Sequence, residues 1–125
     1  MLIIVFIAMG AIIGALSRYY LGVWAVQKWQ LSFPYPTLGV NLTGAFLMGF
    51  LANFFVNQWS IEVQKLILVG FLGSYTTFSS YILDSFKFFN EKRYLVALLY
   101  WVGCPILGLI FLELGVWLSS YLGNF

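Results

Sequence analysis

Residues 70–81 read GFLGSYTTFSSY, and this segment differs from the sequence on either side of it. No aliphatic side chain occurs from Ser74 to Tyr81, whereas aliphatic residues fill the flanking stretches. Nearby glycines lower helix propensity, and hydroxyl side chains compete for backbone carbonyls. We therefore expect a helix that is broken near its middle.

The rest of the chain is strongly apolar. Of its 125 residues, 62% are hydrophobic and 8% are charged, whereas soluble domains have about 45–50% and about 25%. Mean hydropathy is +0.96, and so few charges cannot cover a water-soluble surface. This composition excludes a cytosolic enzyme and a disordered segment, and a net charge of +2 without a basic run excludes a nucleic-acid binder. An integral membrane protein remains.

Polar connections divide the chain into four stretches, each with the roughly 20 apolar residues that a spanning helix needs. The sequence predicts an all-α membrane protein with a single domain over residues 1–125 and both termini on one side. The first stretch lacks a basic leader, so we interpret it as a permanent helix rather than a cleaved signal. The expected helices cover approximately residues 2–24, 37–57, 65–89 and 94–121. The expected connections are Ala25–Pro36, Gln58–Gln64 and Asn90–Arg93.

Basic residues are distributed unequally between the two sides. The side with the first and third connections, counted with their flanks, carries five of them, and the opposite side carries only Lys65. This difference favours termini outside the cytoplasm. If Arg18 and Lys87 lie too deep to count, the bias falls to three against one. The five counted residues are Arg18, Lys28, Lys87, Lys92 and Arg93.

Small residues indicate close helix packing at Gly10 and Gly14, at Ala45 and Gly49, and at Gly103 and Gly108. A chain this small has little room for a pore within itself. We therefore expect an oligomer in which two or more copies supply the walls.

The break at residues 74–81 has two interpretations. Non-helical backbone at membrane depth is tolerated where it is buried in protein or lines a cavity. Carbonyl and hydroxyl oxygens released there would suit an alkali cation, and the N-terminus of the following half-helix would favour an anion. Alternatively, the hydroxyls bond to neighbouring helices in an unbroken helix.

Four other side chains could serve an anion path. Phe78 and Tyr81 share one helical face, and ring edges carry positive polarisation, although such pairs also pack. Asn41 offers two amide donors, either to another helix or to an anion path. Arg18, near the end of the first stretch, either extends to the membrane surface or sets a positive potential in a vestibule.

Two acids lie within the apolar stretches. Asp84 is one turn beyond Tyr81 and could pair with Lys87 three residues on. Glu113 has no partner nearby in the sequence.

Three motifs resemble the Fluc/CrcB family of fluoride channels: GALSRY (14–19), TLGVNLTG (37–44) and GFLGSYTTFSSY (70–81). The similarity extends over the whole chain. It implies passive export of fluoride from the cytoplasm across the bacterial plasma (inner) membrane by a multi-pass protein. The implied assembly is an antiparallel, dual-topology homodimer with two pores, without nucleic-acid or other protein partners.

The resemblance also implies roles for single residues. Backbone carbonyls of Gly73 and Thr76, from both subunits, would hold a central structural Na⁺. Phe78 matches the first of two phenylalanines whose ring edges face fluoride, and Tyr81 stands at the second, which is normally Phe. Asn41 matches a pore-facing asparagine, and Arg18 matches an arginine near the vestibule.

The resemblance implies the remaining path as well. Thr77, Ser79 and Ser80 provide hydroxyls beside the aromatic pair, and Tyr100 begins a polar track on the fourth helix. Asp84 stands where the family usually has Glu. Cys104 and Gly108 stand where a serine or another hydrogen-bonding residue is expected.

Other classes of protein fit less well. A small four-helix drug exporter needs a carboxylate in its first helix, where this chain has Arg18 instead. Glu113 is the only candidate in this chain to replace that carboxylate. A scaffold subunit could use polar residues to hold helices together, but it needs no broken helix. An enzyme is not expected, because histidine is absent and no nucleophile–base pair is visible.

Overall fold

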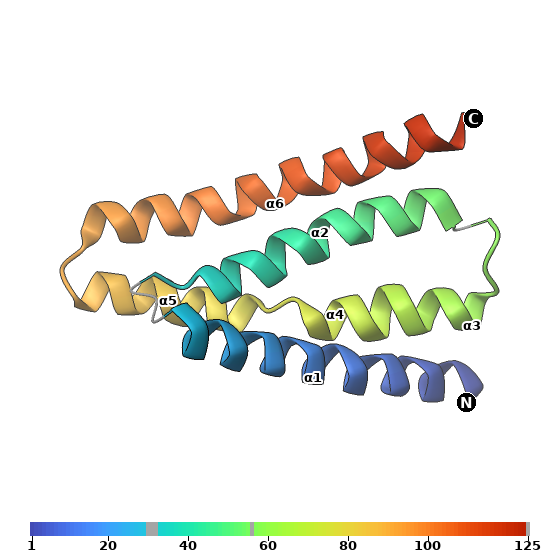
Figure 1. Ribbon diagram of the computed structural model, residues 1–125, viewed down its shortest axis with the longest axis horizontal. Coiled ribbons are helices and arrows are strands. Elements are labelled where there is room, and N and C mark those ends of the chain that lie inside the picture. The colour runs from blue at the N-terminus through green and yellow to red at the C-terminus, as the bar shows by residue number, and fades with distance from the viewer. Residues whose placement is uncertain (30–32, 56, 125) are drawn as a thin grey trace.

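The apolar stretches form long helices that lie side by side (Figure 1). The computed structural model describes residues 1–29, 33–55 and 57–124, and every regular element in that part of the chain is helical. Four runs are long and apolar enough to cross a membrane, with mean hydropathies of 1.5 to 2.4. The elements are α1 (Leu2–Trp29), α2 (Tyr35–Phe55), α3 (Ile61–Gln64), the π-helical η1 (Lys65–Phe71), α4 (Leu72–Tyr75), α5 (Phe78–Asn90) and α6 (Tyr94–Gly123).

The first connection is shorter than expected. α1 continues to Trp29 rather than ending at residue 24, because no proline or glycine interrupts residues 25–29. α2 begins at Tyr35, so Pro36 lies in its first turn, where a missing N–H costs no helical hydrogen bond. Residues 30–32 of the expected connection, and residue 56 of the expected second helix, lie outside the described residues.

The third run begins earlier than expected, at Ile61 rather than residue 65. Ser60 caps it, since its hydroxyl accepts a hydrogen bond from the Val63 N–H at 3.4 Å. The run ends at Asn90, and α6 continues to Gly123 rather than residue 121.

The predicted break in this run is confirmed at Thr76 and Thr77. Both residues have extended backbone, with φ/ψ of −80°/157° and −146°/117°. Figure 1 shows α4 and α5 as two helical halves joined by this short link. The chain therefore places non-helical backbone in the middle of an otherwise apolar run.

α2 packs mainly along α6, while α1 packs along η1 and α4. In Figure 1 both chain ends lie at the same end of the molecule, as the sequence predicts. Close contact depends on glycine, because a Cβ at Gly10 would collide with the Leu66 carbonyl and one at Gly49 with the Leu112 carbonyl. The same packing role was expected for Gly103 and Gly108 and is wrong: an added Cβ there meets nothing within 4 Å among the described residues.

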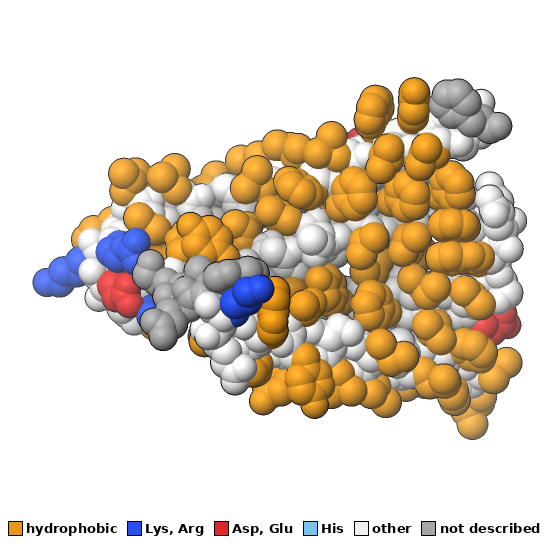
Figure 2. Space-filling model, viewed as in Figure 1, with side chains coloured by type: hydrophobic (Ala, Val, Ile, Leu, Met, Phe, Trp, Pro, Cys, Tyr) orange, Lys and Arg blue, Asp and Glu red, His pale blue; other side chains and the backbone are white. Residues whose placement is uncertain are grey.

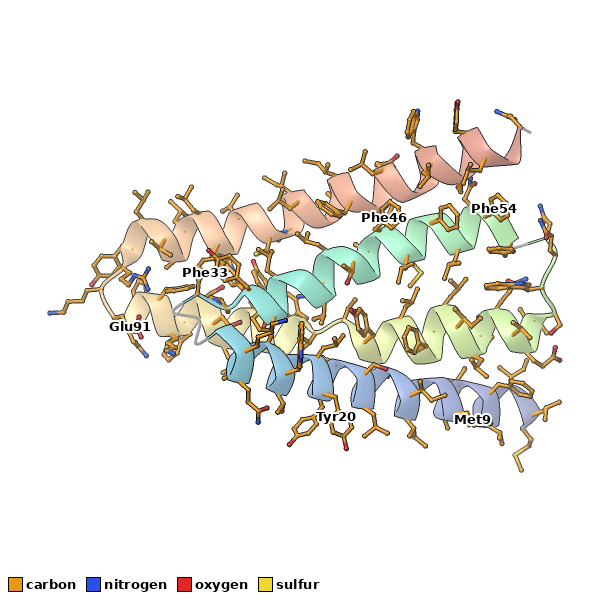
Figure 3. All side chains as sticks on the ribbon, viewed as in Figure 1. Met9, Tyr20, Phe33, Phe46, Phe54 and Glu91 are labelled. Carbon is orange, nitrogen blue, oxygen red and sulfur yellow. The ribbon has the colours of Figure 1, made fainter. Side chains whose placement is uncertain are left out.

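Apolar side chains cover most of the surface in Figure 2, and Lys and Arg side chains gather at one end. Few large apolar residues are buried, whereas many on α1 and α6 are exposed; on α2, Tyr35 is the exposed large apolar residue among those described. Met9 and Tyr20, for example, point away from the other helices in Figure 3. An apolar exterior of this kind suits a lipid surrounding rather than water.

Candidate functional site

Asn41 of α2 holds the backbone at the break. Its Nδ2 donates to the Thr77 carbonyl at 2.9 Å, and its Oδ1 accepts from the Thr77 N–H at 2.7 Å. The Thr77 N–H has lost its helical acceptor at the break and is paired by Asn41, while the Thr77 carbonyl, at the N-cap of α5, gains a side-chain donor. The interhelical hydrogen bond expected as one role of Asn41 is thus present. The amide carries a second N–H, which this pair of bonds does not use.

The Thr77 hydroxyl lies at the N-terminus of α5, the second half of the broken helix. It accepts from the Ser80 N–H at 3.2 Å and so caps α5. The Ser79 and Ser80 hydroxyls lie within 3.3 Å of the same oxygen. Hydroxyl donors therefore gather at a helix N-terminus, whose partial positive charge favours an anion.

Arg18 is partly buried and lies at the level of the break rather than near the end of the first helix. Its Nη1 donates to the Thr76 carbonyl at 3.2 Å. Because α1 continues for eleven residues beyond Arg18, about 16 Å of helix separates this position from the helix end. The hydrogen bond therefore supports a position at the break and not an extension of the side chain to the membrane surface.

Two cavities meet at the break. The first, of about 410 Å³, is lined by Asn41, Thr76, Phe78, Tyr81 and residues of α6. The second, of about 500 Å³, is lined by Arg18 and Ser80 among others. Thr77 lines both. A basic cavity and an aromatic cavity thus lie on either side of one extended residue.

The two aromatic residues are neighbours in different surroundings. The ring centroids of Phe78 and Tyr81 are 5.7 Å apart, and both residues line the first cavity. The Phe78 side chain is 75% exposed, whereas Tyr81 is 5% exposed. The Tyr81 hydroxyl donates to the Trp101 carbonyl of α6. Phe78 thus presents an open ring and Tyr81 an anchored one.

Tyr81 also packs against aromatic residues of α5 and α6. Tyr81, Phe88, Ala97 and Tyr100 form a buried cluster between α5 and α6. Phe33, labelled in Figure 3, packs against Phe88 and Tyr100 at centroid distances of 5.7 and 5.6 Å. Tyr100 is thus part of the core behind the cavity.

Asp84 interacts with α6 rather than with its own helix. The Tyr100 hydroxyl donates to Asp84 Oδ2 at 3.3 Å. The expected ion pair between Asp84 and Lys87 does not form in the described part of the chain, where the two residues only line a common polar cavity. The Asp84 carboxylate thus interacts with α6 and not with Lys87. Glu113 lies exposed on α6, without an ion pair to any described residue.

The break changes the hydrogen-bond partners of the two carbonyls expected to bind Na⁺, those of Gly73 and Thr76. In a continuous helix the Thr77 N–H would donate to the Gly73 carbonyl, but here it donates to Asn41. The Thr76 carbonyl accepts from Arg18 and keeps a second lone pair. Backbone carbonyls are hard oxygen ligands suited to an alkali cation. The residues present therefore fit such an ion.

Sequence reasoning missed the part that Pro105 plays at this site. It lines the first cavity beside Cys104 and Tyr81. A proline inside an apolar stretch signals an unpaired carbonyl one turn earlier, which here is that of Trp101. Gly108 lies one turn beyond Cys104, partly exposed on α6.

Comparison with known proteins extends these observations. A family described as "CrcB-like protein, Camphor Resistance (CrcB)" matches residues 5–116. The chain belongs to the CrcB family. Similar CrcB relatives include the fluoride-specific ion channel FluC of Trichormus variabilis, 46% identical over 94% of this chain and 88% of the relative. FluC of Synechococcus is 44% identical over 90% and 88%, and FluC 1 of Bacillus cereus is 40% identical over 97% and 90%.

Membership in the CrcB family also decides the broad class. The relatives are named as ion channels, so the chain belongs to a class of transport proteins and is not an enzyme. With four helices able to cross a membrane, it is a multi-pass membrane protein. Its relatives come from bacteria, which is consistent with a bacterial plasma membrane. The drug-exporter and scaffold interpretations find no support in the family.

Proposed function

We propose that this protein is a fluoride-selective channel through which cytoplasmic fluoride leaves the cell passively, which reduces fluoride toxicity. One observation carries the proposal: Asn41, Thr77, Phe78 and Tyr81 line one cavity at a broken helix. This arrangement occurs in a chain whose relatives are named fluoride-specific ion channels.

The cavity chemistry suits fluoride. The ion is small, strongly hydrated and only accepts hydrogen bonds, so it needs several donors to replace its water. The second Asn41 amide N–H and the hydroxyls of Ser79 and Ser80 supply such donors near the N-terminus of α5, where the Thr77 hydroxyl donates to Ser80 Oγ. Neutral donors and ring edges bind weakly enough to release the ion, whereas a ring of full charges would trap it.

Arg18 contributes long-range attraction rather than direct binding. Its guanidinium is held by the Thr76 carbonyl and lines the second cavity. A fixed positive charge beside a cavity raises the local concentration of anions. Beyond the aromatic pair, Asp84 continues the proposed path, and Tyr100 contributes from the core through the hydroxyl that it donates to Asp84.

We propose an antiparallel, dual-topology homodimer with two pores. Phe78, Gly73 and Ser79 are exposed beside the break, although such backbone needs cover at membrane depth. A second copy laid on this face would supply the cover. The uneven distribution of basic residues opposes dual topology less than the sequence count indicates, because Arg18 is bonded at the break and not at a membrane surface.

We further propose a structural Na⁺ between the two copies, held by the Gly73 and Thr76 carbonyls of each. The ion would offset the partial negative charge of oxygens that the break deprives of helical donors. Arg18 would share the Thr76 oxygen, which has a lone pair for each.

Ion efflux from liposomes tests the channel function. Purified protein in fluoride- and chloride-loaded vesicles should release fluoride rapidly and retain chloride, as followed by two ion-selective electrodes. Vesicles without protein are the control. Retention of fluoride by vesicles that contain verified, folded protein would contradict the proposal, as would equal release of both ions.

A further inference from the structure

Helix α6 contains a proline in its interior. Pro105 has no backbone N–H, so it cannot donate to the Trp101 carbonyl four residues earlier. Trp101 and Pro105 both lie in a run that is apolar enough to cross a membrane. An unpaired carbonyl is costly there, because lipid offers no replacement donor, and neighbouring side chains commonly supply one.

The missing donor comes from the broken helix. The Tyr81 hydroxyl on α5 donates to the Trp101 carbonyl on α6. The Tyr81 side chain is 5% exposed, and its ring centroid lies 5.5 Å from that of Tyr100. The hydroxyl therefore pairs the carbonyl that the amide of residue 105 pairs in an ordinary helix.

This bond connects two walls of one cavity. Tyr81 and Pro105 both line the cavity that also contains Asn41 and Phe78. Phenylalanine at position 81 could pack in the same place but could not pair the carbonyl, and alanine at position 105 would restore the helical donor.

We propose that Tyr81 and Pro105 form a matched pair across the helix interface, in which the hydroxyl is used by the backbone of α6 and fixes the ring of Tyr81 in the cavity wall. Tyr81 is then a positioning residue whose hydroxyl does not bind the permeating ion. The consequence for ion flow rests on the proposed channel function. The consequence for stability does not.

A double-mutant cycle tests the pair. The four proteins are the unmodified chain, Tyr81→Phe, Pro105→Ala and the double variant, each measured for thermal unfolding and for fluoride efflux from liposomes. With proline present, Tyr81→Phe should lower the unfolding midpoint by several degrees and change the maximal efflux rate several-fold. With alanine at 105, the same change should have little effect on either, since the helix then pairs its own carbonyl.

Tyr94→Phe is the matched control. Tyr94 is an exposed tyrosine at the start of α6 and packs against Phe89. Loss of its hydroxyl should have the same small effect with proline or alanine at 105.

Two results would contradict the proposed pairing of Tyr81 with Pro105. Equal effects of Tyr81→Phe in both backgrounds would show that the hydroxyl does not depend on Pro105. A shift in the half-saturating fluoride concentration in both backgrounds, at unchanged maximal rate, would show that the hydroxyl binds the ion. If the unmodified chain passes no fluoride, the channel function fails, while the coupling in thermal stability still tests the pair.

Discussion

At the scale of single residues, the site uses polar side chains to replace backbone partners. Asn41 engages both the N–H and the carbonyl of Thr77, and Arg18 engages the carbonyl of Thr76. Such buried networks are stable only when their members are paired, so a small chemical change can have a large effect.

Asn41→Asp should reduce fluoride efflux to the level of protein-free liposomes. The aspartate keeps an acceptor for the Thr77 N–H, but it loses the donor to the Thr77 carbonyl and places an acid in an anion path. The electrode assay measures this directly. Asn53→Asp is the control, because Asn53 contacts the Ser119 and Ser120 hydroxyls about 18 Å further along α2. Normal efflux in Asn41→Asp would assign Asn41 a purely structural role.

Phe78→Ile should remove most of the fluoride efflux and leave the folded protein intact. The ring is 75% exposed within one chain, so little intrachain packing is lost, whereas the polarised ring edge disappears. Phe86→Ile, at a 59% exposed site on the same helix, should retain efflux. Efflux that is unchanged in Phe78→Ile would argue against an aromatic path.

At the scale of elements, the arrangement depends on close contact between helix backbones. Gly10 and Gly14 of α1 face the carbonyls of Leu66 and Phe71 in η1, and Gly70 of η1 faces the carbonyl of Ile7. In a membrane, helices associate through such van der Waals contact at small residues rather than through exclusion of water. This contact holds α1, and with it Arg18, against the broken helix.

Gly10→Ala should therefore destabilise the protein by roughly 1–3 kcal/mol, the usual cost of an overfilled contact. Its Cβ would collide with the Leu66 carbonyl, which belongs to rigid helical backbone. Gly22→Ala on the same helix is the matched control, since its Cβ would meet nothing within 4 Å. Thermal unfolding in detergent compares the two. An equal midpoint for both variants would contradict the close contact.

At the scale of the whole molecule, one chain buries Thr77 but leaves residues beside the break exposed. The face that carries Phe78 and Ser79 is exposed, and the described helices provide few large buried apolar side chains. A second copy packed on this face would cover the backbone beside the break. It would also supply the other carbonyl ligands of the proposed Na⁺ site. Assembly and ion binding are thus expected to depend on each other.

Single-molecule photobleaching of labelled protein in sparse liposomes should show two copies per particle. Labels placed at residue 124 should be accessible from both faces of the membrane, because the two copies run in opposite directions. Photobleaching in one step would contradict the dimer, and labels on a single face would contradict dual topology.

Replacement of Na⁺ by a bulky organic cation should lower the unfolding midpoint of the assembled protein and reduce fluoride efflux. A ligand that binds only the folded state stabilises it in proportion to its occupancy, so its removal destabilises that state. Titration of Na⁺ back into the buffer should restore the midpoint in a saturable way. A midpoint insensitive to Na⁺ over the whole range would contradict the proposed cation site.

Local sequence determined the elements of this protein. Apolar stretches of sufficient length predict helices, and hydroxyl residues without aliphatic neighbours predict the break, because both depend on propensity and composition within one segment. The helix ends were less predictable. α1 passes its expected end, and Pro36 lies in the first turn of α2 instead of preceding the helix, because apolar runs carry few signals that separate helix from connection.

Tertiary structure alone decided the partners of the polar groups. Arg18 and the Thr76 carbonyl are 58 residues apart, and Asn41 and Thr77 are 36 apart. Tyr81 reaches the carbonyl that Pro105 leaves unpaired only because α5 and α6 lie in the right register. Helix packing sets that register through shape, which residue types do not encode locally. The sequence thus names the donors and acceptors, and the fold selects which of them meet.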